Sequence, residues 1–474
     1  MDKNLYKSII TREEYKLVNE LVSNGKLKEY RYLIDMFEDE KYLLLEMMDK
    51  NPTDIYNEII KDYLKIVKGI SMITPGLSTG IKDSKSGVSI YTYDGETFEN
   101  HKIDENTRFD LASSTKLFTS IETLKLAEEG KIDLSKNVSQ VNSKYKNLNI
   151  PIEKMAKFYY DLRTDGRLDE DISLKELEKR LYSTKVNLDN TFLYSDIPFI
   201  ILKDLLPSAD DYFKKYFNDE MNMLMTSYDN FGIITGSKDN NIHDPKAKIF
   251  EKYNIYPGHA GIYSTSRDLI KLFDSLNNGF LSSNSIKKLI TPVHDNFVLL
   301  NDDGSLKFKK DKDGNDIGIY NVTRAMGVYI KHPEGIRASE LTDALSNEAF
   351  AITGFTGCYA AFDLKNGLSA NILANPLSND NVKEFLIDNN LYTIEDCHKK
   401  FKDGVKFKVY GKVSQVSDDK IPFTRITNTL KESQIYTLLK LRLAKNALIK
   451  KAEIMNSKLL EENIKKSFEN LKVR

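Results

Sequence analysis

The sequence predicts a fold of mixed helices and strands, in which a strand-containing core is preceded and followed by helical segments. Residues 1–70 carry apolar residues at helical spacing, and the chain turns helical again from about Leu430 to Arg474. Between these segments, residues 87–95 alternate apolar and polar side chains as a strand does. Two further strand-like runs flank Asn366-Gly367, a dipeptide typical of hairpin turns. We therefore expect an α+β protein with helical N- and C-terminal extensions.

Composition and charge narrow the class of protein. Of the 474 residues, 41% are hydrophobic and 29% charged, and the mean hydropathy of -0.44 is typical of a soluble protein. The formal net charge of -1 favours neither nucleic acid nor membrane as a general partner. No stretch approaches the roughly 18 continuous apolar residues of a membrane span, and the first residues lack an apolar signal segment. We therefore expect a cytoplasmic location.

The two cysteines, Cys358 and Cys397, are too few and too far apart in sequence to suggest a disulfide framework or a metal site. In the N-terminal segment, Thr11 and Glu14 form a capping-box pattern. Thr53 or Asp54 can cap a later helix in the same segment. The apolar stripes of these helices indicate packing, and we assign them no chemistry.

A strand pair is predicted to lead into a helix that carries the first candidate for chemistry. Pro75-Gly76 opens the pair, and the helix begins at or near Ser113 and ends at Gly130. Ser113 and Lys116 are three residues apart, so the amine can lie beside the hydroxyl. A serine needs a base to become a nucleophile, and a lysine in a dry pocket loses its charge readily enough to help. The alternative is that Ser113 is a simple N-cap and Lys116 points into solvent.

The flanking residues favour the catalytic interpretation. The segment Phe109-Asp110-Leu111-Ala112-Ser113-Ser114-Thr115-Lys116 resembles the first motif of the serine β-lactamase and penicillin-binding-protein superfamily. The resemblance is to the class C-like branch, which also contains esterases and D-amino-acid peptidases. It extends over roughly residues 70–380, with further motifs in the order that the family has them.

The second motif is Tyr194-Ser195-Asp196, about eighty residues after Ser113. In the family, a tyrosine at this point lies beside the serine. A nearby lysine lowers the pKa of such a tyrosine, which can then relay the proton from nucleophile to leaving group. The resemblance implies this role for Tyr194, and it implies that Asp196 orients Lys116. Because tyrosines are common in this chain, the alternative for any one of them is packing.

Two adjoining segments match the family closely: His243-Asp244-Pro245-Lys246-Ala247, and the segment from Gly258 to Leu269. Thr265 or Ser266 can cap the helix that follows. His259 can reach the pocket, or it can hydrogen-bond loops together, and the sequence leaves both roles open.

The third motif, Ile352-Thr353-Gly354, departs from the family, which carries Lys-Thr-Gly or His-Thr-Gly at this point. We expect it on a strand beside the serine, next to a strand over residues 325–330. The resemblance implies that the Phe355 N–H is the second oxyanion donor. Ile352 removes the cation that the family has here.

The segment Arg163-Thr164-Asp165-Gly166 also departs from the family. Arg163 or Arg167 can replace the cation that is missing at position 352. Beyond Pro376 the resemblance fades, residues 405–413 alternate like a strand, and the C-terminal extension is rich in lysine.

The resemblance implies an α/β sandwich of the β-lactamase/transpeptidase-like type, with a central antiparallel sheet flanked by helices and an all-helical insertion. We divide the chain into a helical extension (1–70), a serine hydrolase domain (71–395) and a C-terminal strand with a basic helical extension (396–474). The implied activity is hydrolysis of a small-molecule ester or amide, or of a D-amino-acid substrate, through a Ser113 acyl-enzyme, without a metal or organic cofactor. The alternatives are a catalytically reduced binding or scaffold protein, and a D,D-peptidase or β-lactamase with an altered third motif. A protein partner for the terminal helices is left open.

Overall fold

The computed structural model describes residues 52–71, 74–236, 241–294, parts of 301–331, most of 341–375, 405–409, 412–416 and 428–469. A six-stranded antiparallel sheet forms its centre, with the strand order β10-β11-β12-β13-β1-β2. The strands are β1 (Gly76–Asp83), β2 (Val88–Gly95), β10 (Tyr329–Ile330), β11 (Phe350–Thr353), β12 (Tyr359–Asp363) and β13 (Leu368–Ala374). The first and last parts of the core therefore meet in the middle of the sheet, where β1 pairs with β13.

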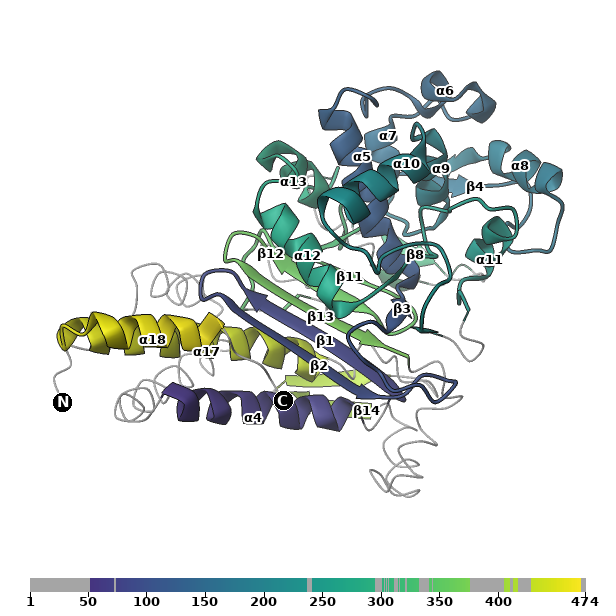
Figure 1. Cartoon of the computed structure of the whole chain (residues 1–474). Coiled ribbons are helices and arrows are strands. Elements are labelled where there is room, and N and C mark those ends of the chain that lie inside the picture. The colour runs from purple at the N-terminus through teal and green to yellow at the C-terminus, as the bar shows by residue number, and fades with distance from the viewer. Residues whose placement is uncertain are drawn as a thin grey trace.

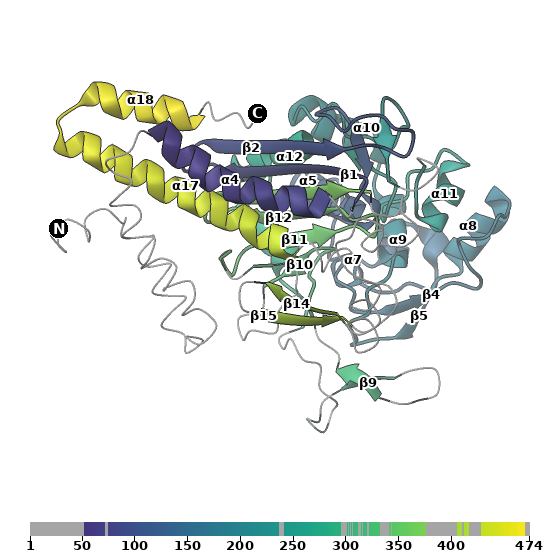
Figure 2. The ribbon, with the colours of Figure 1, turned by 90° about the horizontal axis from the view of Figure 1, so that it is seen from below.

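Helices cover both faces of the sheet (Figure 1). On one face lie α5 (Thr115–Glu128), α12 (Ser266–Asn277) and α13 (Ser283–Ile290). On the other lie α4 (Pro52–Ser71) and α17 (Asn428–Ile454), with α18 (Lys458–Glu469) folded back on α17, as Figure 2 shows from below. The α/β sandwich expected from the sequence is confirmed, and the helices of the two extensions form one of its layers.

Each layer has its own apolar core. Side chains on the α5 face, such as Phe118, Phe199 and Ile352, belong to one buried cluster. Tyr63 of α4, Ile81 of β1 and residues of α17 belong to a second cluster on the opposite face. This division follows from the period of a strand, because alternate residues point to opposite faces of the sheet.

The strand predicted from alternation is confirmed as β2, and the hairpin predicted from Asn366-Gly367 is confirmed as β12–β13. Gly367 at the hairpin turn has φ +69°, a left-handed conformation that glycine adopts without strain. The strand predicted over residues 325–330 is shorter, because residues 325–328 form a tight turn with Gly327 at φ +78°. The strand expected over 405–413 is instead a hairpin of β14 (Val405–Val409) and β15 (Lys412–Val416). The helix starts and caps predicted before residue 52 lie outside the described residues.

The segment between α5 and β7 (Tyr263–Ser264) is the expected insertion, and it is largely helical rather than all-helical. Its helices are α6 (Val138–Val141), α7 (Ile152–Ala156), α8 (Leu174–Tyr182), α9 (Ile197–Leu205), α10 (Ala209–Phe213) and α11 (Pro245–Glu251). The π-helical turn Lys214–Glu220 follows α10. The insertion also contains the small β4–β5 hairpin (Asp161–Arg163 and Lys185–Leu188). Elsewhere, β8 (Phe308–Lys310) pairs with β9 (Asp316–Ile319).

A second small sheet leads the chain into the serine helix. In it, β3 (Arg108–Asp110) lies between β6 (Ile234–Thr235) and β7. Within the part of the chain that the structure describes, no helix is both long and apolar enough to cross a membrane.

Candidate active site

Ser113 lies on a short 3₁₀ turn, Ala112–Ser114, that connects β3 to α5. Ala112 has φ +43°, an uncommon conformation for a residue with a Cβ atom, and it reverses the chain before the serine. The buried Asp110 carboxylate holds the turn by accepting a hydrogen bond from the Ala112 N–H at 2.8 Å. The predicted helix start at Ser113 is correct to within one turn, and Gly130 follows the last residue of α5 at φ +70°.

Lys116 is fully buried, and its Nζ atom is 3.1 Å from Ser113 Oγ. The same ammonium group donates to Asp196 Oδ1 at 2.9 Å and to the His259 carbonyl at 3.2 Å. Burial alone lowers the pKa of Lys116, but Tyr194 and Asp196 outweigh it and the pKa is raised. Burial therefore does not by itself make this lysine lose its charge, because Tyr194 and Asp196 share the pocket.

Tyr194 lies beside Lys116, whose Nζ atom is 4.9 Å from the centre of the tyrosine ring. Burial alone raises the pKa of Tyr194, but the charges of Lys116 and Arg324 and hydrogen bonds with Lys116 and Ser113 lower it. The net effect is a pKa below the usual value for tyrosine. A tyrosine beside a cation and a serine hydroxyl is suited to accept the serine proton.

Asp196 joins Lys116 to a second lysine. Its Oδ2 atom accepts from Lys246 Nζ at 3.0 Å, so the carboxylate lies between two ammonium groups. These charges hold the pKa of Asp196 far below its usual range despite partial burial. Next to this pair, His259 Nε2 is 3.0 Å from Asp244 Oδ1, and the His259 side chain is fully buried. The imidazole therefore links two loops, while the backbone carbonyl of His259 contacts Lys116.

Ligand atoms of Asp196, Asp244 and His259 lie within 4.8 Å of one another, which is close enough to consider a metal ion. The charge of Asp196 is already balanced by two lysines, and one oxygen of Asp244 binds the imidazole and caps α11. This set therefore fits an ion-pair network that orients Lys116 better than it fits a cation site.

The third motif runs along β11 toward the serine turn. The 3₁₀ turn contacts β11, and a Cβ atom on Gly354 would lie 2.2 Å from the Leu111 carbonyl oxygen. Only glycine allows this approach, and it brings the end of β11 against the turn that carries Ser113. Thr356 Oγ1 also donates to the Asp110 carbonyl at 2.6 Å. The side chain of Phe355 is 70% exposed and stacks on His243.

Ile352 is 1% exposed and lies in the apolar cluster on the α5 face, so it presents no polar group to the site. Arg163 and Arg167, considered as substitutes for the missing cation, are 60% and 74% exposed and bind Asp161 and Asp169. Each of these arginines is thus exposed and already paired with a carboxylate, which argues against either of them as the replacement charge. The Arg324 guanidinium carbon lies 3.9 Å from the centre of the Tyr194 ring, and the sequence analysis did not single out this arginine.

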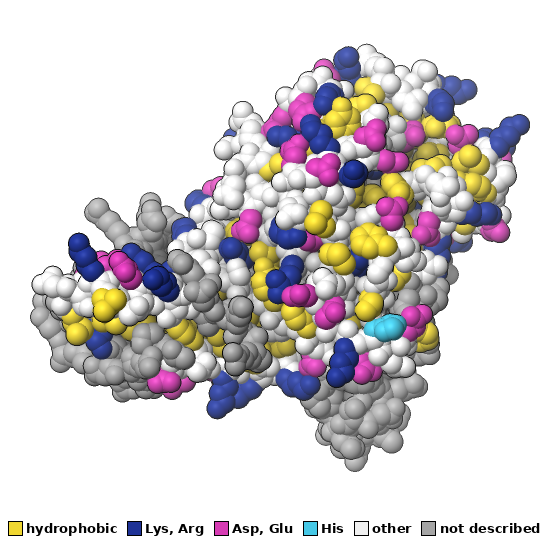
Figure 3. Space-filling model, in the orientation of Figure 1, with side chains coloured by type: hydrophobic (Ala, Val, Ile, Leu, Met, Phe, Trp, Pro, Cys, Tyr) yellow, Lys and Arg dark blue, Asp and Glu magenta, His cyan; other side chains and the backbone are white. Residues whose placement is uncertain are grey.

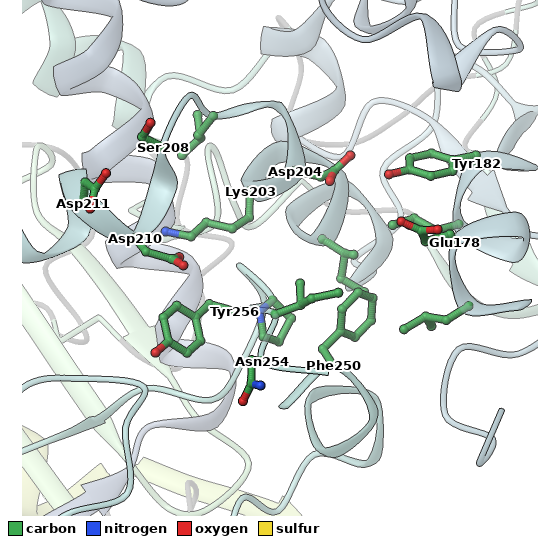
Figure 4. A pocket seen from close by; sticks show the side chains of 16 residues that line it. Glu178, Tyr182, Lys203, Asp204, Ser208, Asp210, Asp211, Phe250, Asn254 and Tyr256 are labelled. Carbon is green, nitrogen blue, oxygen red and sulfur yellow. The ribbon is translucent and has the colours of Figure 1, made fainter. Parts of the chain in front are cut away.

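A separate cavity of about 440 Å³ lies near the far end of α9 from Asp196. Figure 4 shows Lys203 extending toward Asp210 inside it. Lys203 Nζ donates to the buried Glu122 at 2.6 Å, so an internal carboxylate already compensates its charge. On the face in Figure 3, acidic and basic side chains are interspersed over the helical region without a continuous patch of one sign.

A sheet between two helical layers, with a serine and a lysine at the start of a buried helix and a tyrosine beside them, defines a class of serine hydrolases. The family model described as Beta-lactamase matches residues 74–390, and the chain belongs to this family.

Solved structures include two similar chains. One is a penicillin binding protein from Bacillus halodurans, with 17% identity, a TM-score of 0.48 and coverage of 70% of this chain and 100% of that one. The other is a β-lactamase/D-alanine carboxypeptidase from Yersinia pestis, with 16% identity, a TM-score of 0.48 and coverage of 69% and 97%. No curated protein matches the chain.

Proposed function

We propose that this protein is a serine hydrolase that cleaves a small ester or amide through an acyl-enzyme on Ser113. The observation that carries the proposal is the contact of Lys116 Nζ with both Ser113 Oγ and Asp196 Oδ1, at 3.1 and 2.9 Å. Such a contact is expected of a charged lysine that organises a nucleophile, whereas a simple N-cap serine needs no buried lysine.

In the proposed mechanism, Tyr194 as phenolate takes the proton of Ser113 while the hydroxyl oxygen attacks the substrate carbonyl. Lys116 remains an ammonium group and stabilises the phenolate. The N–H groups of Ser113 and Phe355 bind the oxyanion of the tetrahedral intermediate. Tyr194 then returns the proton to the leaving group, and a water molecule hydrolyses the acyl-enzyme by the reverse proton path.

Because Ile352 is apolar, we expect substrates that have no carboxylate group next to the third motif. A cation at this position helps to hold the carboxylate of penicillins and of D-Ala-D-Ala ends. Without it the site loses a charge-assisted hydrogen bond of roughly 1.5–3 kcal/mol, a factor of about ten to more than a hundred in rate. We therefore expect p-nitrophenyl esters to be better substrates than nitrocefin or a D-Ala-D-Ala peptide. Equal kcat/KM values for the ester and the β-lactam would contradict this specificity.

The nucleophile is tested by labelling with a fluorophosphonate and measuring the intact mass. We expect the wild-type protein to gain one adduct and Ser113→Ala to gain none. Ser114→Ala is a matched control, because Ser114 is the adjacent buried serine and its hydroxyl has no hydrogen-bond partner. If Ser113→Ala is labelled as fully as the wild type, Ser113 is not the nucleophile. If neither protein is labelled, the protein is better described as a binding or scaffold protein that keeps the fold of a hydrolase.

A further inference from the structure

Arg324 is a buried arginine, 8% exposed, that lies between two tyrosine rings. Its guanidinium carbon is 3.9 Å from the centre of the Tyr194 ring and 3.6 Å from the centre of the Tyr329 ring. Its Nη1 atom is buried without a hydrogen-bond partner. A buried guanidinium with an unpaired nitrogen is costly, so stacking on the two rings is its main interaction.

The backbone around Arg324 is fixed relative to the serine helix. Arg324 and Tyr329 form a β-bridge across the tight turn at Gly327. The Met326 carbonyl in that turn accepts a hydrogen bond at 2.9 Å from Ser120, which lies one turn after Lys116 on α5. The guanidinium is thus held at a defined place beside the catalytic candidates.

Arg324 also lies close to the altered third motif, because its bridge partner Tyr329 belongs to β10, which pairs with β11. Tyr329 pairs with Ala351, the residue before Ile352. The Tyr329 hydroxyl accepts a hydrogen bond from Thr353 at 3.5 Å. The arginine therefore occupies the strand side of Tyr194, where Ile352 provides no charge, while Lys116 approaches the tyrosine from α5.

We propose that Arg324 is a positioning residue for Tyr194, which holds the tyrosine ring beside Ser113 and adds a second positive charge next to that ring. This inference rests on the proposed function, in which Tyr194 accepts the serine proton. Among the residues that the structure describes, Lys116 from α5 and Arg324 from the loop before β10 place their charges next to the Tyr194 ring, and Asp196 acts through Lys116. Both cations favour the phenolate, in line with the lowered pKa of Tyr194.

The pKa of Tyr194 can be measured directly by NMR on protein labelled with ¹³C-tyrosine. The chain has 26 tyrosines, so the resonance is assigned by its loss in Tyr194→Phe. We expect Arg324→Gln to raise the pKa of Tyr194 by about one pH unit, and Arg324→Lys to raise it less. Arg163→Gln, an exposed arginine outside the site, is the matched control and should leave it unchanged. If Arg324→Gln does not fold, Arg324→Met removes the same charge and keeps an apolar side chain.

An unchanged pKa of Tyr194 in a folded Arg324→Gln or Arg324→Met protein would overturn the inference.

Hydrolysis of a neutral ester provides a second readout. Because the phenolate is the reactive form, the acid limb of the kcat/KM profile should move to higher pH, with a loss in kcat rather than KM. In a Tyr194→Phe background, Arg324→Gln should have little further effect. A loss confined to KM for anionic esters, with the pKa of Tyr194 unchanged, would make Arg324 a substrate-binding residue instead. Absence of any acylation in the wild type would count against the proposed function, while the NMR titration would still decide the role of Arg324.

Discussion

Lys116 donates to the Ser113 hydroxyl, the Asp196 carboxylate and the His259 carbonyl, and Tyr194 lies beside the same ammonium group. An ammonium group has three N–H donors and no lone pair, so a lysine in these surroundings donates and does not accept. The proton of Ser113 must then go elsewhere, and Tyr194 is the neighbouring group whose pKa is lowered. At the residue scale, the site therefore depends on the positive charges that lower the pKa of Tyr194.

Lys116 and Tyr194 should therefore act as one unit. We expect Lys116→Ala or Tyr194→Phe alone to lower kcat/KM by about 10²–10⁴-fold, and the double variant to lose little more than the worse single variant. The measurement is ester hydrolysis by the four proteins of the cycle. Lys65→Ala, an exposed lysine on α4, is the control and should keep full activity. Strict additivity of the two losses in free energy would place the residues in different sites.

Local spacing was enough to place Lys116 next to Ser113, because only three residues separate them between the 3₁₀ turn and the start of α5. The prediction that Tyr194 and Asp196 lie beside Ser113 rested on the family resemblance, in which the motifs follow one another in a fixed order. The charge of Lys116 was not predictable, because it depends on Asp196, a partner that only tertiary structure provides. Arg324 carries no local signal at all, since its role follows from two rings that lie far from each other in sequence.

At the scale of elements, the end of β11 and the serine turn are fitted against each other at Gly354. Its Cβ position is occupied by the Leu111 carbonyl, so any larger residue must push the strand away from the turn. The alternation of side chains predicted β2, whose burial alternates along the strand, and the Asn366-Gly367 turn signal predicted the β12–β13 hairpin, whose strands are buried throughout. The strand expected over residues 325–330 was too long, because Gly327 has φ +78° and a Cβ atom added to it would lie 2.8 Å from the Phe199 ring.

We expect Gly354→Ala to destabilise the protein by about 1–3 kcal/mol and to lower the rate of acylation at least about tenfold. The reason is that the strand and the Phe355 N–H shift away from Ser113. Thermal unfolding and fluorophosphonate labelling rates measure the two effects. Gly69→Ala provides the contrast, because nothing lies within 4 Å of the added Cβ on helix α4. Equal labelling rates for Gly354→Ala and wild type would mean that the end of β11 does not position the oxyanion donor.

At the scale of the whole molecule, the sheet is held between a helical layer that carries Ser113 and a layer made by α4 and α17. A buried ion pair joins the second layer to the sheet, because Arg442 of α17 donates to both carboxylate oxygens of Asp83 at the end of β1. Arg442 is 5% and Asp83 0% exposed. The pair lies on the opposite face of the sheet from the site, so it contributes to stability and not to chemistry.

Replacing Arg442 by Met should lower the free energy of unfolding by about 3–5 kcal/mol, because Asp83 is left buried without its partner. The double variant Arg442→Met/Asp83→Asn should recover part of this loss. Urea denaturation measures both, with Lys465→Met as the control for an exposed ion pair, which should change stability by less than about 1 kcal/mol. A similar loss in the Arg442 and Lys465 variants would show that the buried pair has no special weight.

The pairing of β1 with β13 has a consequence for how a cell makes this protein. During translation, α4, β1 and β2 leave the ribosome long before β13 and α17 have been synthesised. The sheet cannot close, and its second face cannot be covered, until the late part of the message has been read. Until then the nascent chain exposes two apolar surfaces to chaperones and proteases, and a message truncated before β13 yields a chain that cannot bury them.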